Sequence, residues 1–334
     1  MRIIRSWSDI PPEPHVVTIG NFDGVHRGHQ YLLTTVHERA ATRGLPSLAI
    51  TFDPLPLEVL APERAPQRLS LTDQRLRLIL ACGIDRVLLV QFDRSFAALS
   101  PKEFVDLLVQ STHLTTIVVG EDFHFGRGRT GDPALLRELG RSHGFEVVVL
   151  PRLSELSETI SSTRIRQLIA AGAVREAGTL LGRPYALTGT VVAGTGRGSQ
   201  LGFPTANIAV ADRLMLPGDG IYAAIAHLSG SWYPALAYIG SRPTFPGAGH
   251  AVEVYLIDQT YPTLRGETIT VYFIERIRPD RAFPDAEALV EQMRDDERNG
   301  RAVLQAAMAD WPPPLVQALH VALEGVEVID DPGS

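Results

Sequence analysis

The sequence predicts two folded parts: an α/β domain of the Rossmann-like, doubly wound type, followed by a small antiparallel β-barrel domain with C-terminal helices (α+β). Its 334 residues, 45% of them hydrophobic, are enough for two cores. Apolar segments alternate with helical patterns in the first half, which is typical of a parallel sheet. After Gly182-Arg-Pro184 the pattern changes to short segments separated by glycine and proline. We therefore expect one domain over residues 1–183 and a second over residues 184–334.

The strands of the first domain are expected where Val, Ile and Leu are dense, with helices between them. Serine marks the start of two helices, because Ser70 offers a side-chain cap and Ser100, with Glu103, offers a capping box. Cys82, the only cysteine, lies in an apolar helix pattern and is expected to pack in the core. The expected strands cover residues 15–20, 46–52, 84–91, 115–120 and 145–150.

A glycine-bounded turn within residues 17–30 joins the first strand to a helix expected to begin around His29. His26 and His29 flank the first turn of that helix, where free backbone N–H groups and the helix dipole favour an anion. Glycine lets the backbone approach a phosphate closely. The glycines concerned are Gly20, Gly24 and Gly28, and the residues expected on the buried side of the helix are Tyr31, Leu32, Leu33 and Val36.

Two other interpretations of His26-Arg-Gly-His29 are a solvated loop and half of a zinc site with Asp23. No third histidine or cysteine follows at metal-ligand spacing. The stretch lies where the first strand of an open α/β sheet meets its first helix, which is where such sheets bind ligands. Its position therefore favours a nucleotide site.

The second half predicts a compact barrel whose chemistry centres on residues 194–207. Glycines there permit backbone N–H groups to surround phosphates, although a glycine-rich turn by itself is also consistent with an ordinary hairpin. Thr205 and Asn207 offer hard oxygen ligands of the kind that Mg²⁺ takes beside nucleotide phosphates. Expected strands cover 185–192, 220–228, 232–239, 252–257 and 268–277, expected helices cover 285–298 and 303–308, and the tail 330–334 is expected to be disordered.

Composition excludes several classes of protein. The net charge of −7 argues against a nucleic-acid partner, because such domains usually carry a basic face. The only lysine, Lys102, is in no Gly-X-X-X-X-Gly-Lys loop, so phosphate chemistry must use arginine, histidine, backbone N–H groups and metal. The N-terminus has no signal-peptide pattern and no apolar run could span a bilayer, so we expect a cytoplasmic protein with no membrane partner.

The stretch Gly20-Asn-Phe-Asp-Gly-Val-His-Arg-Gly-His29 resembles the HxGH nucleotidyltransferases, and most closely the bifunctional bacterial riboflavin kinase/FAD synthetases. Ile160-Ser-Ser-Thr-Arg-Ile-Arg166 and Leu201-Gly-Phe-Pro-Thr-Ala-Asn207 resemble two further signatures of that family. The resemblance implies that ATP and riboflavin give FMN in the second domain, and that ATP and FMN give FAD and pyrophosphate in the first.

The same resemblance assigns site residues. His26, His29 and Arg166 would serve adenylyl transfer, and Glu253 would be the base for the riboflavin 5′-hydroxyl. Nucleotide-binding residues would be Gly20, Phe22, Asp23, Gly28, Asp122, Ser162, Thr163, Gly194, Gly196, Arg197, Gly198 and Pro204, with Thr205 and Asn207 on Mg²⁺.

The chain departs from the family pattern at four positions that bear on function. Leu55 stands where a histidine is common, and Tyr238, Tyr255 and Arg265 replace family residues of the kinase domain. Two alternatives therefore stay open. One is a monofunctional FAD synthetase with a flavin-binding, kinase-impaired second domain, and the other is a flavin sensor or carrier without turnover. The sequence does not predict an oligomeric state.

Overall fold

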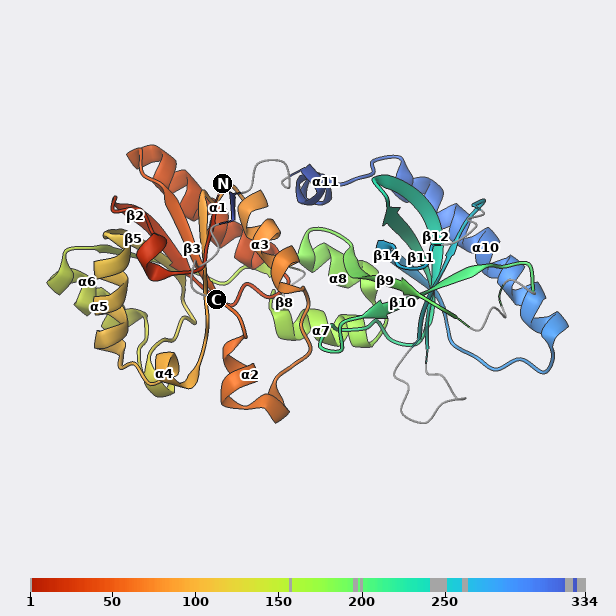
Figure 1. Ribbon diagram of the computed structural model, residues 1–334, viewed down its shortest axis with the longest axis horizontal. Coiled ribbons are helices and arrows are strands. Elements are labelled where there is room, and N and C mark those ends of the chain that lie inside the picture. Colours follow the sequence, from red (N-terminus) through yellow and green to blue (C-terminus); the bar gives the residue numbers. More distant parts are fainter. Residues whose placement is uncertain are drawn as a thin grey trace. The chain divides into compact units, whose positions relative to one another are not determined.

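The chain folds into two compact units, which we describe separately. In the computed structural model, unit 1 comprises residues 1–161 and 314–334, and unit 2 comprises residues 162–313 (Figure 1). The structure describes residues 2–155, 158–194, 198, 201–240, 251–259, 264–321 and 327–328, with only the backbone of 154, 155, 158, 321, 327 and 328. The predicted disordered tail, residues 330–334, lies outside the described residues.

Unit 1 is built on a parallel sheet, as predicted. Each strand is rich in Val, Ile or Leu, and every pairing within the sheet is parallel. The seven strands lie in the order β15 (Glu327–Val328), β1 (Arg2–Ile4), β4 (Arg86–Val90), β3 (Ser47–Phe52), β2 (His15–Ile19), β5 (Leu114–Gly120) and β6 (Glu146–Leu150).

Helices cover both faces of this sheet, so its strands are apolar on both sides. The helices are α1 (Arg27–Arg43), α2 (Pro56–Leu60), α3 (Thr72–Ala81), α4 (Arg94–Ala97), α5 (Pro101–Thr112), α6 (Pro133–His143) and α11 (Pro314–Val321). Val17 and Ile19 of β2 join the core that α5 and α6 complete, whereas Val16 joins the core of α1, α3 and α11. Unit 1 is completed by the 3₁₀ turns η1 (Trp7–Asp9), η2 (Pro62–Arg64) and η3 (Arg127–Arg129) and the hairpin β7 (Ser154–Glu155) with β8 (Glu158–Thr159).

Unit 2 contains the predicted antiparallel barrel. Its closed strand order is β10 (Thr205–Val210), β13 (Ala251–Leu256), β12 (Ser231–Gly240), β11 (Gly220–Leu228), β14 (Thr268–Pro279) and β9 (Tyr185–Val192). Closure removes the unpaired edges of a sheet. Alternate residues fill the interior, for example Tyr222, Ala224 and Ala226 of β11, all 0% exposed. Strand β10 was not predicted, because its residues were interpreted only as part of the glycine-rich segment.

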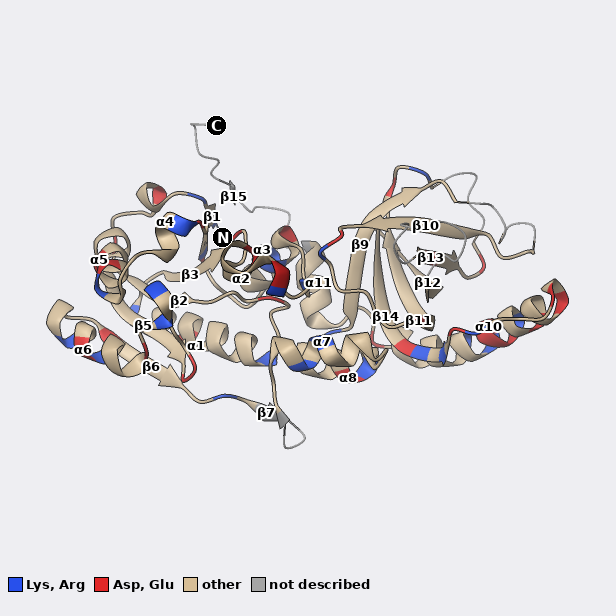
Figure 2. Cartoon of the chain, turned by 90° about the horizontal axis from the view of Figure 1, so that it is seen from below, with Lys and Arg blue, Asp and Glu red and all other residues tan. Residues whose placement is uncertain are grey.

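Among the described residues of unit 2, three helices pack with the barrel: α7 (Ser162–Ala170), α8 (Val174–Leu181) and α10 (Ala286–Met308). The sequence predicted two C-terminal helices, over 285–298 and 303–308, where α10 is continuous through Gly300. A Cβ at Gly300 would lie 2.4 Å from Leu236 Cδ2, so the glycine lets α10 pack closely on β12. Figure 2 shows acidic and basic residues interspersed along the helix, where Arg298 pairs with Asp295.

The division into compact units differs from the predicted domain boundary at 183/184. Helices α7 and α8 contact one another, and α8 packs against β14 and β9, so they are grouped with the barrel. Arg276 of β14 donates to the carbonyl of Ala171 at the end of α7 (3.2 Å), and Arg175 of α8 pairs with Glu275 (3.0 Å). The functional boundary therefore stays a proposal, separate from the packing of these helices.

Local expectations for helix α1 and helix α3 need correction. Helix α1 begins at Arg27, and Tyr31 is 42% exposed, because the buried stripe is Leu33, Val36 and Ala40. Tyr31 is two positions from Leu33, which places it on the opposite side of a helix with 3.6 residues per turn. Ser70 does not cap α3, whose N-cap residue is Leu71 without a side-chain hydrogen bond. The capping box at Ser100 is confirmed, since Ser100 and Glu103 exchange hydrogen bonds.

Candidate active sites

The loop between β2 and α1 has an unusual backbone that brings its side chains inward. Phe22, Gly24 and Val25 all have positive φ, of 49°, 79° and 40°. Phe22 and Val25 are 0% exposed and belong to the core shared with α1 and α3. Left-handed backbone at residues other than glycine costs free energy and persists where the surroundings enforce it. Here burial of the two apolar side chains provides that enforcement.

The two histidines of the predicted nucleotide site lie face to face. The ring centroids of His26 and His29 are 3.6 Å apart with planes 14° from parallel, and Phe22 meets the edge of His29. His26 is the N-cap of α1, and its Nδ1 accepts from the backbone N–H of His29 (3.3 Å). Because Nδ1 accepts, a neutral His26 carries its proton on Nε2. The stacked pair therefore lies at a helix N-terminus, where anions are favoured.

His29 is uncharged at neutral pH. Burial and the neighbouring His26 ring hold the pKa of His29 well below its ordinary value of 6.5. Its Nδ1 is buried and has no hydrogen-bond partner in the described part of the chain. Buried polar atoms are normally satisfied, so an orphaned one at a helix N-terminus is a feature of a site that awaits a polar ligand.

Gly28 lies close to the His26 ring. A Cβ at residue 28 would lie 3.2 Å from both Cε1 and Nδ1 of His26. Gly20 is similarly close to Phe22, since a Cβ at residue 20 would lie 3.0 Å from Cζ of that ring. The glycines of this stretch thus permit close packing of its own aromatic rings, in addition to any approach of a phosphate.

Asp23, which the sequence assigned to nucleotide binding, is already engaged by the protein. It is 3% exposed, and its carboxylate accepts from the backbone N–H of Leu69 (3.0 Å) and of Ser70 (3.2 Å). Ser70 Oγ in turn accepts from the N–H of Gly24 (3.1 Å). Asp23 and Ser70 therefore hold the histidine loop against the segment before α3, a role that sequence reasoning missed for Ser70.

Leu55, the departure from the family histidine, is 9% exposed at the N-cap of α2. The backbone N–H of Leu55 donates to the carboxylate of Glu58 (2.8 Å). Arg68 donates both to Glu58 and to Asp53, and its Nη2 lies 2.8 Å from Asp53 Oδ1. These ion pairs organise the segment after β3 without a histidine.

The remaining predicted residues of the first site come from two other segments. Asp122 follows β5, is exposed, and pairs with Arg152 (3.1 Å). Ser162, Thr163 and Arg166 lie in the first turns of α7, which is grouped with unit 2. The structure therefore brings His26, His29, Phe22, Asp23, Gly20 and Gly28 together within unit 1.

Strand register assembles the second site on the outer face of the barrel. Asn207 of β10 lies opposite Glu253 of β13, and Glu253 lies opposite Tyr238 of β12. Two residue pairs along the same strands, Thr205 donates from Oγ1 to Glu253 Oε2 (3.0 Å). The predicted base and both predicted metal ligands are thus neighbours, although Thr205 and Glu253 are 48 positions apart.

Glycines of the loop after β9 accommodate these side chains. A Cβ at Gly194 would lie 2.1 Å from Asn207 Nδ2, and one at Gly198 would lie 2.3 Å from the carbonyl oxygen of Phe203. Both positions are therefore sterically restricted to glycine. Gly196 and Arg197, which the sequence also assigned to nucleotide binding, lie outside the described residues.

The oxygen donors of this site suit Mg²⁺. The hydroxyl of Thr205, the amide of Asn207 and the carboxylate of Glu253 are hard ligands of the type that this ion prefers. Asn207 is 6% exposed, so its amide is held in place rather than extended into solvent. Within the described residues, no group of three or more His, Cys, Asp or Glu side chains could hold a metal.

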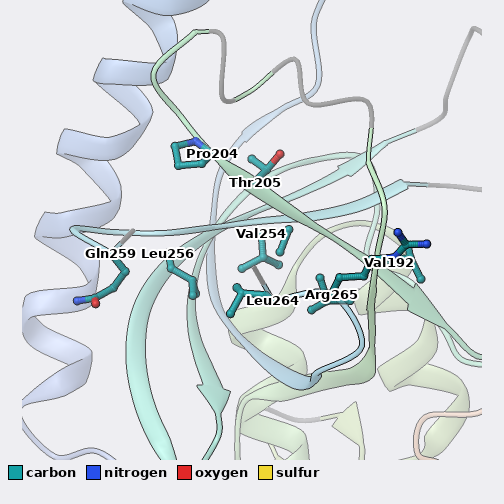
Figure 3. Close-up of a pocket in the computed structure, with 10 residues that line it drawn as sticks. Val192, Pro204, Thr205, Val254, Leu256, Gln259, Leu264 and Arg265 are labelled. Carbon is teal, nitrogen blue, oxygen red and sulfur yellow. The ribbon is translucent and has the colours of Figure 1, made fainter. Parts of the chain in front are cut away.

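A pocket of about 240 Å³ opens beside Thr205. Its walls include Val191, Val254 and Leu256, with Arg265 and Gln259 at its polar edges. In Figure 3, Pro204 and Thr205 lie across the pocket from Leu264 and Arg265. Glu253 is not among the lining residues, so the pocket adjoins the site through Thr205.

Two further ionisable groups of unit 2 are Tyr238, which lies opposite Glu253, and Asp258, which follows the end of β13. The Tyr238 hydroxyl donates to Asp280 (3.1 Å). The pKa of Tyr238 is raised, mainly by burial and to a lesser extent by the negative charge of Asp280. Asp258 is exposed and is bound at both oxygens by Arg301, each at 2.6 Å. These hydrogen bonds hold the pKa of Asp258 below its ordinary value. Glu253, in contrast, is the carboxylate that lies beside Thr205 and Asn207.

Two family models match consecutive parts of the chain. A family model described as FAD synthetase matches residues 9–164, and one described as riboflavin kinase matches residues 181–304. The chain is 41% identical over 303 residues to the bifunctional riboflavin kinase/FMN adenylyltransferase of Escherichia coli K12, covering 90% of this chain and 96% of that protein. It is 39% identical over 307 residues to the Pseudomonas fluorescens protein of the same name, covering 91% and 98%.

The fold is also found in a solved structure. A crystal structure titled a macrolide-efflux protein from Streptococcus pneumoniae aligns with a TM-score of 0.82 and 34% identity, covering 90% of this chain and 98% of that one. None of the described helices is both long and apolar enough to cross a bilayer. With two signature sites, two matching family models and relatives of this identity along nearly their whole length, the chain belongs to the family of bifunctional riboflavin kinase/FMN adenylyltransferases.

Proposed function

We propose that the two activities of this family are divided along the chain, with FMN adenylylation in residues 1–183 and riboflavin phosphorylation in residues 184–334. ATP is the donor in both reactions. The observation that carries the proposal is the independent assembly of the two sites, the stacked His26 and His29 in one unit and the Thr205, Asn207 and Glu253 group in the other.

In the adenylyl transfer, an FMN phosphate oxygen attacks the α-phosphorus of ATP. The new P–O bond forms as the bond to the bridging oxygen breaks, which releases pyrophosphate. Negative charge accumulates on the α-phosphate oxygens, and the Nε2–H of His26, the imidazole of His29 and the first N–H groups of α1 stabilise it. His29 contributes as a neutral group in the free enzyme, because its pKa is lowered.

The family signature supplies the remaining groups of this reaction. Ser162, Thr163 and Arg166 contact the ATP phosphates, and Asp122, Gly20 and Phe22 contribute to nucleotide binding. These assignments rest on the sequence resemblance. Asp23 supports the site by holding its loop, since its carboxylate accepts from backbone N–H groups.

In the kinase reaction, the riboflavin 5′-hydroxyl oxygen attacks the γ-phosphorus of ATP and ADP leaves. Glu253 takes the hydroxyl proton as general base, and Thr205 orients its carboxylate through the 3.0 Å hydrogen bond. Gly194, Gly198 and Pro204, with Gly196 and Arg197 by resemblance, surround the phosphates, and the pocket beside Thr205 accepts the nucleoside end of ATP. Its apolar walls suit a flat ring.

Thr205 and Asn207 would hold Mg²⁺ in the kinase site. When bound there, the ion would neutralise charge on the β- and γ-phosphates of ATP. Substrates of the protein are the small molecules ATP, riboflavin and FMN, without a nucleic-acid or membrane partner, and we propose the cytoplasm as its location because ATP is consumed there.

The test is to incubate the pure protein with ATP, Mg²⁺ and either riboflavin or FMN, and to separate the flavins by chromatography. We expect FMN and FAD from riboflavin, and FAD from FMN. FAD from FMN without conversion of riboflavin would instead identify a monofunctional synthetase. The absence of any product would identify a flavin-binding protein without turnover.

A further inference from the structure

The segment that follows α10 leaves unit 2 and completes unit 1. Residues 305–334 lie beyond both family matches, which end at 164 and 304. Trp311 still packs with Trp232 and Tyr272 of the barrel, at centroid distances of 5.3 and 5.4 Å. From Pro314 onward the chain is part of unit 1, where α11 contacts α3 and β15 pairs with β1.

Helix α11 is packed into the core that supports the histidine loop. Val316 is 0% exposed and Leu319 is 5% exposed. Leu319 belongs to the same apolar cluster as Leu76 and Ile79 of α3 and as Phe22 and Val25 of the loop. Removal of Leu319 therefore removes contacts from a cluster that reaches the site.

Hydrogen bonds connect helix α3 and the segment before it to neighbouring parts of unit 1, including the histidine loop. Leu69 and Ser70, just before the helix, donate their N–H groups to Asp23. Arg75, within the helix and 0% exposed, donates from Nη2 to the carbonyl of Phe52 at the end of β3 (2.6 Å). A shift of α3 would therefore move the backbone that holds Asp23 and Gly24.

We propose that α11 is a positioning element of the adenylyl-transfer site, acting through α3 and the Asp23 hydrogen bonds on the loop that presents His26 and His29. This inference rests on the proposed function of that site. The pairing of β15 with β1 is a second attachment of the same segment, with Arg2 opposite Glu327 and Ile3 opposite Val328. The residues of the kinase site belong to unit 2, whereas α11 belongs to unit 1.

The experiment compares Leu319→Ala with the wild-type full chain, with Leu319→Met as a volume-conserving variant and with Gln317→Ala, an exposed position of α11, as the matched control. FAD formation from FMN and riboflavin phosphorylation are measured in the same preparations. Hydrogen exchange is followed over residues 20–30 and 66–72. We expect Leu319→Ala to lower kcat for FAD formation by roughly 10–100-fold, because small displacements of catalytic groups have effects of this size.

Riboflavin phosphorylation should stay near wild type, exchange should accelerate at residues 66–72, and Leu319→Met should restore most of the rate. An unchanged rate of FAD formation in Leu319→Ala, or an equal loss of both activities, would overturn the inference. If the strands of unit 1 also lose protection, Leu319→Val replaces Leu319→Ala and is judged by the same outcomes. A wild-type chain that makes no FAD would instead refute the proposed function.

Discussion

The two sites are built in different ways. In unit 1, one continuous stretch from Gly20 to His29 supplies the histidines, the glycines and the helix N-terminus. In unit 2, Thr205 and Glu253 come from different strands, and the register of β10 against β13 brings them together. A site made from one stretch depends on local backbone conformation, whereas a site made across strands depends on pairing, where a slip of one residue would turn every side chain to the other face.

The largest expected effect tests the cross-strand site. Glu253→Gln keeps the size of the side chain and removes the base, so riboflavin phosphorylation should fall by about 10²–10⁴-fold in kcat with little change in KM for riboflavin. FAD formation from FMN should be unaffected. Asp258→Asn is the matched control, because that carboxylate is bound by Arg301. A Glu253→Gln enzyme within about threefold of wild type would exclude Glu253 as the base.

The corresponding test of the local site is His29→Ala. Loss of one group that stabilises developing charge should lower FAD formation by about 10²–10³-fold, with kinase activity near wild type. His37→Ala, on the same helix outside the site, serves as the control. If both activities fell together in His29→Ala, the two sites would not be independent.

A pair of glycine substitutions compares the tolerance of the two designs. Gly194→Ala places a Cβ 2.1 Å from Asn207 Nδ2, whereas Gly28→Ala places one 3.2 Å from the His26 ring. Overpacking of this kind costs about 1–3 kcal/mol, which corresponds to a rate loss of roughly 5–150-fold if the site bears it. We expect Gly194→Ala to lower the rate of riboflavin phosphorylation by a factor near the upper end of this range. Gly28→Ala should lower the rate of FAD formation by a factor near its lower end. The reverse order in steady-state assays would show that the histidine loop is the more rigid of the two.

The smallest expected effect is a difference in acid stability. The pKa values of His15 and His29 in unit 1 are lowered, chiefly by burial, and in unit 2 the pKa of His227 is lowered by burial. Below pH 6.5 the unfolded chain binds protons at these histidines that the folded chain does not, so stability falls as the pH falls. When the pH is lowered from 8 to about 5.5, the thermal unfolding temperature of unit 1 should fall more than that of unit 2. Equal shifts of both transitions would contradict this difference between the units.

The sequence predicts the local features well and the long-range ones poorly. The strand, the turn and His26 beside a helix start follow from residues within one turn of each other. The partner of Asp23 does not, because Leu69 and Ser70 are 46 and 47 positions away, and Ser70 has the local pattern of an N-cap. The local pattern around Ser70 therefore indicated the start of a helix. It did not indicate the hydrogen bond from Ser70 to Asp23.

Gly300 and α11 show the same limit in the second half. A glycine inside a helical pattern indicates a break unless the close approach of Leu236 is known. Helix α11 was not predicted, and nothing local indicates that its residues pack on α3, because the two helices are joined only by tertiary contacts. Both features depend on a partner that is distant in sequence, and pattern alone does not identify such partners.

The return of the chain to unit 1 also sets an order of events during synthesis. Unit 1 needs strand β15, which ends at Val328, although its first continuous part ends at Ser161. At about 5–20 residues per second, the ribosome takes roughly 8–33 s to add the residues between those two points. All of unit 2 is translated within that interval. The part of the protein that emerges first is therefore the last to gain its full set of native contacts, and until then the edge of β1 and the α11-binding surface of α3 are exposed to chaperones and to other nascent chains.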